Sequence, residues 1–231
     1  MDATIKVWSA NTGALLGTLC GHDQQVTALA LGAGGRLWSA SSDGLVKGWP
    51  MAVVADVNNG ADDGIDDLHN LVLSLPHPAG VLNLAVTPTA TATTATPDAC
   101  APTRIFALCE DYTIWVWSST GRKIQHFSAA PDPAPYGWED SVRGGALEVS
   151  PDGLLLFSAG VVDASMRVWL LNAEPVVAAD GTEISPYLIV SAPPIKVLVT
   201  SELGYCTIEA LAVAPSGHIY TAGADKTVRL W

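Results

Sequence analysis

The stretch DKTVRLW at residues 225–231 decides the fold, because the same heptad pattern occurs at four earlier places in the chain. Each copy places an Asp six residues before a Trp, with apolar and polar residues alternating between them. The earlier copies are DATIKVW (2–8), DGLVKGW (43–49), DYTIWVW (111–117) and DASMRVW (163–169). This pattern predicts a tight turn followed by a short, half-buried strand. The chain is therefore a series of repeats of one β unit.

The sequence upstream of the last four heptads also repeats. In each unit an aromatic residue is directly followed by a small residue. These pairs are Trp38-Ser39, Phe106-Ala107, Phe157-Ser158 and Tyr220-Thr221. A turn such as residues 150–153 and an apolar strand such as residues 208–213 precede the aromatic residue, and a further apolar segment follows four of the Trp residues. Each unit is therefore predicted to be four short antiparallel strands joined by turns.

These units resemble the repeats of WD-repeat (WD40) proteins. The family's marks are the pair Gly21-His22, the heptad ending and the SPDG turn at residues 150–153. The resemblance implies an all-β fold of β-propeller type, in which four-stranded antiparallel blades stand radially around a channel. The dipeptide Trp-Asp that names the family is missing, since the residues after Trp are Ser9, Pro50, Ser118 and Leu170.

The resemblance also implies a hydrogen-bonded network within each blade, made by a His, a Ser or Thr, the turn Asp and the final Trp. Such buried polar groups are tolerated when their polar atoms are paired. The expected members are His22, Ser39, Asp43 and Trp49, then His77, Asp111 and Trp117, then Ser158, Asp163 and Trp169, then Thr221, Asp225 and Trp231. The blades that lack the His are expected to hold together mainly by packing. No Gly-x-Ser-x-Gly elbow accompanies the first set, so we do not interpret it as a hydrolase triad.

The chain contains about four blades' worth of strands. We assign residues 1–49 to a partial blade plus the first full blade and residues 50–117 to a second blade with acidic and Ala/Thr/Pro inserts. Residues 118–169 form a third blade, and residues 170–231 a fourth that lacks its outer strand. The segment 14–20 is a candidate for that strand, in which case the opening strand 3–8 competes with residues 227–231 for one place. An incomplete ring is therefore expected: a piece of a larger propeller, for example a seven-bladed one, a chain that pairs with another to close the ring, or an open arc or small ring.

Candidate partner-binding residues lie in the inserts and the turns. Trp-to-Trp spacings of 41, 68, 52 and 62 residues place inserts at 55–67, 87–103, 129–140 and 172–194, because an undecorated repeat needs about 40 to 45 residues. The inserts are either specificity loops or tolerated expansions. Trp115 and Trp138 are either covered locally or exposed as binding anchors. The residues ahead of each turn Asp would point to the face that the family uses: Ser42, Glu110, Val162 and Ala224.

Composition argues against several other classes of function. The formal net charge of −12 counts against nucleic acid, and it reflects either solubility or a basic partner. Residues 68–97 are uncharged but are interrupted by Pro76, Pro78 and Pro88, so no membrane span is expected. The four cysteines show no CxxC spacing, and the acidic segment 62–67 fails the EF-hand pattern. We therefore expect no metal and no other cofactor.

Other proteins are the expected partners. The leading hypothesis is a protein–protein interaction scaffold without catalysis of its own, intracellular, in the cytoplasm or the nucleus. The alternative is a substrate-recognition subunit of a multi-protein regulatory complex such as a ubiquitin ligase, although the Trp-Asp-x-Arg ending of one group of ligase receptors is missing. An enzyme is disfavoured because the sequence carries no convergent carboxylates, metal ligands or phosphate loop.

Overall fold

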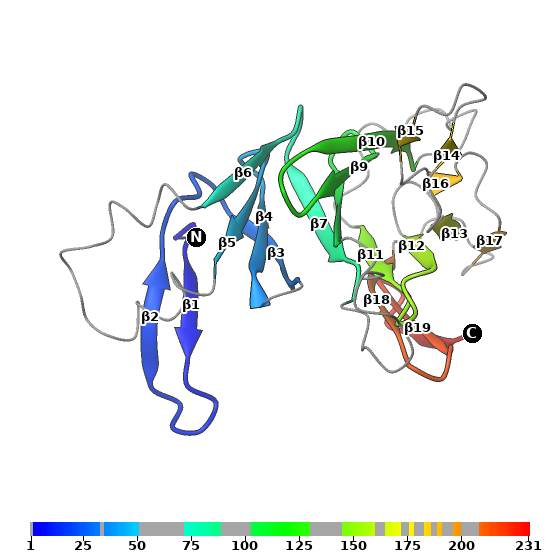
Figure 1. Cartoon of the computed structure of the whole chain (residues 1–231). Helices are drawn as coiled ribbons and strands as arrows, with labels where there is room; N and C mark the ends of the chain where they lie inside the picture. Colours follow the sequence, from blue (N-terminus) through cyan, green and yellow to red (C-terminus); the bar gives the residue numbers. More distant parts are fainter. Residues whose placement is uncertain are drawn as a thin grey trace, which may run out of the picture.

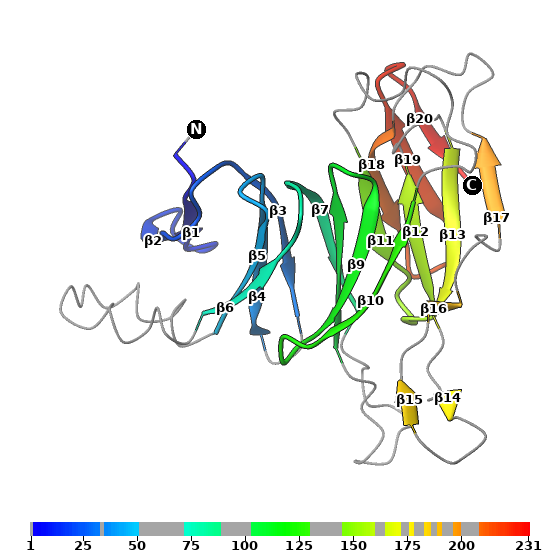
Figure 2. The same cartoon turned by 90° about the horizontal axis from the view of Figure 1, so that it is seen from above.

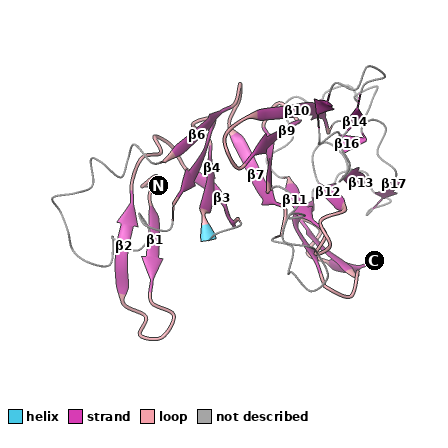
Figure 3. Ribbon diagram, in the orientation of Figure 1, coloured by secondary structure: helices cyan, strands magenta, loops and turns pink. Residues whose placement is uncertain are grey.

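The computed structural model describes residues 2–32, 35–50, 72–88, 103–129, 145–159, 165–171 and 208–231, together with four short strands between residues 176 and 199. Nearly all of the regular structure in these residues is strand (Figure 3). The strands form antiparallel sheets that follow one another in chain order along an open arc (Figures 1 and 2). This is the expected all-β propeller architecture with an incomplete ring.

Two of the sheets have four strands in sequence order. They are β3 (Val26–Leu31), β4 (Leu37–Ser41), β5 (Leu45–Trp49) and β6 (Leu73–Pro76), then β7 (Val81–Val86), β8 (Arg104–Cys109), β9 (Thr113–Ser118) and β10 (Lys123–Ser128). The next sheet contains β11 (Ala146–Val149), β12 (Leu155–Ala159) and β13 (Ser165–Leu171), with β16 (Ile189–Val190) and β17 (Lys196–Val199) both paired to β13. The last sheet contains β18 (Ile208–Val213), β19 (Ile219–Gly223) and β20 (Val228–Leu230). Two hairpins complete the set, β1 (Ile5–Trp8) with β2 (Leu15–Leu19) and β14 (Val176–Val177) with β15 (Glu183–Ser185).

The sheets are offset by one strand from the blade boundaries assigned from the sequence, which end each blade at the Trp of its heptad. Strand β6 follows the Trp of one heptad and pairs with β5 of that heptad, and β2 pairs with β1 in the same way. The segment after a Trp thus forms the outermost strand of the preceding sheet. Along the arc, β3 contacts β7, β7 contacts β11, and β11 contacts β18, so the first strands of successive sheets lie side by side.

The repeated Asp closes the turn that leads into the third strand of a sheet. Its carboxylate accepts the backbone N–H two residues later, which is the geometry of an Asx turn. These bonds run from Leu45 to Asp43 at 2.9 Å, from Thr113 to Asp111 at 3.1 Å and from Thr227 to Asp225 at 3.1 Å. The residue between has a positive φ, which is 80° at Gly44, 62° at Tyr112 and 63° at Lys226. The Asp that begins the heptad therefore favours a turn because its carboxylate bonds to the backbone two residues later.

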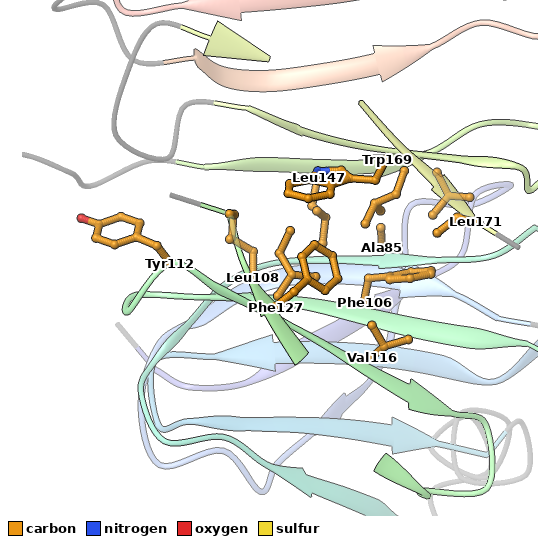
Figure 4. Close-up of a cluster of buried hydrophobic side chains, with 13 residues drawn as sticks. Ala85, Phe106, Leu108, Tyr112, Val116, Phe127, Leu147, Trp169 and Leu171 are labelled. Carbon is orange, nitrogen blue, oxygen red and sulfur yellow. The ribbon is translucent and has the colours of Figure 1, made fainter. Parts of the chain in front are cut away.

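Apolar cores lie between successive sheets, so a central sheet is buried on both faces. All six residues of β8 are buried, which explains why this strand is apolar without strict alternation. Between the second and third sheets, the rings of Phe127 and Trp169 lie 4.8 Å apart at the centre of one core (Figure 4). Packing is tight enough that a Cβ on Gly48 would lie 2.6 Å from the ring of Trp38.

Candidate functional site

The first four-stranded sheet contains a continuous buried chain of hydrogen bonds. The Asp43 carboxylate accepts from His22 Nδ1 at 2.8 Å and from the Asp23 N–H at 3.0 Å. His22 Nε2 lies 2.8 Å from Ser39 Oγ, which also accepts the indole N–H of Trp49 at 2.9 Å. Burial would raise the pKa of Asp43, but the hydrogen bonds from Asp23 and His22 outweigh it and the pKa lies below its ordinary value. Ser39 is fully buried, so its hydroxyl serves the fold and cannot meet a substrate here.

The second sheet uses the same positions in a different arrangement. Ala107 stands where the first sheet has the hydroxyl, and the Trp117 indole N–H donates directly to His77 Nε2 at 3.0 Å. Asp111 accepts from the Thr113 N–H and hydroxyl, and among the described residues His77 Nδ1 has no hydrogen-bond partner. Burial lowers the pKa of His77 to about 4, so its ring is neutral at pH 7 and can accept from Trp117. The structure thus brings His77 and Trp117 together but leaves Asp111 outside the network.

In the described part of the two later sheets, the tryptophan donates to the hydroxyl of the second strand. Trp169 Nε1 donates to Ser158 Oγ at 2.9 Å, and Trp231 Nε1 donates to Thr221 Oγ1 at 3.1 Å. Asp163 lies outside the described residues. The heptad tryptophan therefore has a hydrogen-bond acceptor in each of the four sheets. The acceptor is an imidazole in the second sheet and a hydroxyl in the other three.

Three comparisons with known proteins agree with this geometry. The family model described as "WD domain, G-beta repeat" matches residues 13–50 and 196–231. The nuclear distribution protein PAC1-2 of Uncinocarpus reesii is 48% identical over 52 residues, which are 22% of this chain and 11% of that protein. The β-propeller domain of Cps50 (Swd1) from Myceliophteria thermophila aligns with a TM-score of 0.58 over 99% of this chain and 59% of its own, at 15% identity. The chain carries WD repeats at residues 13–50 and 196–231 and has the fold of a β-propeller.

The fifth residue of the heptad faces the outermost strand of a blade in this WD-repeat chain. Lys47 on β5 donates to Ser74 on β6 at 3.2 Å. In the last sheet, where β20 pairs only with β19 among the described strands, Arg229 turns instead to Asp225 at 2.6 Å. That hydrogen bond lowers the pKa of Asp225 to about 2. The position therefore suits a long cation at the blade's outer edge.

Trp115 occupies this fifth position in the second blade and is half-buried. Its cross-strand neighbour His126 stacks on the ring at 5.0 Å, and Lys123 Nζ lies 3.7 Å from the ring centroid. Trp117 stacks at 6.1 Å and His77 meets the ring edge-on at 5.7 Å. The groups that cover Trp115 thus include two side chains of the neighbouring strand β10. Trp138, the second candidate anchor, lies outside the described residues.

The residues ahead of the turn Asp share one face of the arc, because they occupy equivalent turns in successive blades. The Ser42 N–H donates to the Gln25 carbonyl at 3.0 Å, and the Glu110 N–H donates to the Gly80 carbonyl at 2.8 Å. The Glu110 and Ala224 side chains are exposed and Ser42 is half-buried. These turns thus have fixed backbones and variable, accessible side chains. Val162 falls outside the described part of the chain.

Reactive groups are few in the described part of the chain. No three His, Cys, Asp or Glu side chains gather there as a metal site would require. Burial raises the pKa of the Cys109 thiol to about 12, so its nucleophilic thiolate is not populated near neutral pH. No helix among these residues has the length and hydropathy that a membrane crossing needs. The acidic segment 62–67 is outside the described residues.

Proposed function

We propose that this chain is a protein-interaction scaffold that binds other proteins through the face of the arc carrying Ser42, Glu110 and Ala224. The observation that carries the proposal is that one set of residues in a blade holds the sheet together and another set is exposed at the turns. Polar groups of the repeat, such as His22 and Ser39, are consumed in hydrogen bonds inside the sheet. The turn residues beside them are held by backbone bonds and leave their side chains free for contact.

A rigid face with different side chains at equivalent positions favours a protein partner over a small ligand. Ser42, Glu110 and Ala224 present a hydroxyl, a carboxylate and a methyl group at equivalent positions. The blades therefore do not offer the same small-ligand contact several times over. Asp23 and Asp111, beside Ser42 and Glu110, are also exposed. This part of the face is therefore acidic, which supports a partner with a basic contact surface.

The experiment compares substitutions on the proposed face with a substitution on the opposite side of the arc. Glu110→Arg and Ala224→Arg each place a large cation on the proposed face, while Asn11→Arg places the same cation in the exposed turn between β1 and β2, at the opposite end of the strands. Proteins captured from the source cells by the wild-type chain are quantified with each variant. We expect at least one partner to fall about tenfold or more with the two face variants and to remain with Asn11→Arg. If every captured protein responds alike to the three variants, the proposed face is wrong.

The same capture experiment tests the finer alternative, a substrate-recognition subunit of a regulatory complex such as a ubiquitin ligase. That role requires a catalytic subunit among the proteins that depend on the face. We place the scaffold inside the cell, in the cytoplasm or the nucleus. The free thiols of Cys20 and Cys109 support this, because a reducing compartment keeps cysteines unpaired.

A further inference from the structure

The second blade carries its cations on the outermost strand and not on the third. The fifth heptad residue is Lys or Arg in the other four heptads, but it is Trp115 in this one. The outermost strand β10 begins at Lys123, directly after Arg122, and both of these side chains are exposed. The outermost strands of the two preceding sheets, β2 and β6, contain no Lys or Arg. The second blade therefore presents positive charge to solvent at its outer edge.

These two cations are not neutralised by carboxylates of the described residues. Elsewhere in the chain, the Lys6 ammonium lies 3.6 Å from the Asp2 carboxylate, and Arg229 pairs with the turn Asp of its own heptad at 2.6 Å. Within the described residues, neither Arg122 nor Lys123 forms such an ion pair. The whole chain has a formal net charge of −12. Two adjacent unpaired cations in so acidic a chain can pair with carboxylates of another molecule.

The Lys123 side chain is held in place by the ring of Trp115. Its Nζ lies 3.7 Å from the ring centroid, which is a cation–π contact. The ring itself is fixed, because its indole N–H donates to Thr113 Oγ1 at 2.9 Å and the ring of His126 stacks on it at 5.0 Å. A partner that binds Lys123 therefore loses less side-chain entropy than it would on a freely rotating lysine.

The turn that carries Arg122 is also fixed. The Arg122 N–H donates to Ser118 Oγ at 3.0 Å, and the Gly121 N–H donates to the Ser118 carbonyl at 3.0 Å. Gly121 has a φ of 86°, and a Cβ there would lie 2.9 Å from the Leu73 side chain. The turn is therefore seated against β6 of the preceding blade, and its backbone needs no rearrangement to present Arg122.

We propose that the outer edge of the second blade, made by Trp115, Arg122, Lys123 and His126, binds an acidic segment of a partner protein. Carboxylates of the segment pair with Arg122 and Lys123, while its apolar groups lie against the rings of Trp115 and His126. The aromatic residue at the fifth heptad position thus has a purpose in this blade. It holds a cation of the next strand in position for the partner.

This edge is separate from the turn face proposed above for partner binding. The turn Asp111 lies six residues before Trp117 along β9, which is about 20 Å in an extended strand. Lys123 lies directly opposite Trp117, at the far end of that strand. The two surfaces therefore lie at opposite ends of one blade and carry opposite charge. Each can be lost without the other.

A protein segment fits the edge better than a nucleic acid, although rings and cations together also suit single-stranded nucleic acid. Affinity for a phosphate backbone comes from many cations spread along it. Here two cations stand at one end of the blade, and the exposed carboxylates of Glu110 and Asp111 stand at the other. A long polyanion would meet both, whereas a short acidic segment meets only the cations.

The first test measures binding of a fluorescently labelled oligoglutamate peptide to the whole chain by anisotropy. We expect the peptide to bind, an oligoglutamine peptide of the same length not to bind, and the affinity to fall with added salt. Lys123→Glu should weaken binding at least about tenfold, because it replaces an attraction by a repulsion. Lys226→Glu is the matched control, since Lys226 is also exposed and unpaired among the described residues but lies in the turn before β20. No binding of the oligoglutamate peptide, or an equal loss with both variants, would overturn the proposal.

The second test separates the role of the ring from that of packing. Trp115→Phe keeps an aromatic face under Lys123 and should retain the affinity for the peptide, whereas Trp115→Leu should weaken it about threefold. Equal affinities of these two variants would show that the ring does not position Lys123. Glu110→Arg should not weaken peptide binding, so this site and the proposed turn face can fail separately. If a single-stranded oligouridine of the same length binds more tightly than the peptide, the edge is a nucleic-acid site and the proposal is wrong.

Discussion

Replacing Ser39 by Ala removes one oxygen from the centre of the first blade's network. Ser39 Oγ accepts the indole N–H of Trp49 at 2.9 Å and lies 2.8 Å from His22 Nε2. The side chain is fully buried and Trp49 is 1% exposed, so water cannot replace the lost oxygen without opening the core. The stability of the blade should therefore depend on this hydroxyl.

The structure limits the response to two alternatives. If His22 keeps its 2.8 Å bond to Asp43, the indole N–H of Trp49 and His22 Nε2 both lose the partner that Ser39 provides. If His22 instead moves to accept from Trp49, the blade copies the second sheet, where Trp117 donates to His77 and His77 Nδ1 has no partner among the described residues. Either way at least one buried polar group loses its partner, and one such loss costs about 1–3 kcal/mol. We expect Ser39→Ala to lower the free energy of unfolding by about 2 kcal/mol.

Thermal unfolding followed by circular dichroism measures this effect. For a chain of this size, about 2 kcal/mol lowers Tm by roughly 4–8 °C. Ser74→Ala in the same blade is the control, because Ser74 is exposed and its bond from Lys47 is at the surface. Ser158→Ala should fall between them, since the described residues give the Ser158 hydroxyl one side-chain partner, the indole of Trp169. If Ser39→Ala lowers Tm no more than Ser74→Ala, the network does not stabilise the blade and the reasoning is refuted.

Three further changes test the packing, the turns and the titration of the blades. Gly48→Ala would place a methyl group 2.6 Å from the fully buried ring of Trp38, and should cost about 1–3 kcal/mol in urea unfolding. Lys226→Gly relieves a positive φ of 63° and should raise Tm slightly, by the equivalent of about 0.5 kcal/mol after the entropy of glycine is counted. Burial lowers the pKa of His77 from 6.5 to about 4, so between these pH values the unfolded chain is protonated at His77 and the folded chain is not. The contribution of His77 to the free energy of unfolding is therefore fully present above pH 6.5 and is lost as the pH falls towards 4, by about 2 kcal/mol at pH 5. His77→Gln should flatten that part of the Tm–pH profile, and an unchanged slope would contradict the assignment.

The fold was predictable because the heptad encodes both ends of a strand. Its Asp makes the turn, its alternating residues make the strand, and its Trp is placed to fill the core between blades. The offset of the sheets by one strand was not predictable in the same way. The segment 14–20 reads equally well as the start of one repeat or the end of another, and only pairing settles that β2 lies on β1 in this chain.

The hydrogen-bond pairs inside a blade were easier to anticipate than the surroundings of Trp115. Pairs such as Ser39 and Trp49 lie at fixed offsets within one repeat, so one alignment relates them all. The cover of Trp115 comes from His126 and Lys123 on the next strand, and the register there shifts between Lys123 and Gln125. A shift of one residue reverses which side chains face the ring. The sequence alone carries no signal for that irregularity.

The same reasoning explains where binding specificity would reside in the proposed scaffold. Positions that the repeat keeps constant are held by burial and by hydrogen bonds, as His22 and Trp49 are. A change at such a position alters the stability of a blade before it alters any contact with a partner. The turn positions Glu110 and Ala224 are exposed, with their neighbouring turn Asp providing the turn geometry. Because the fold makes no demand on these side chains, they can differ from blade to blade, and their differences are what a partner can recognise.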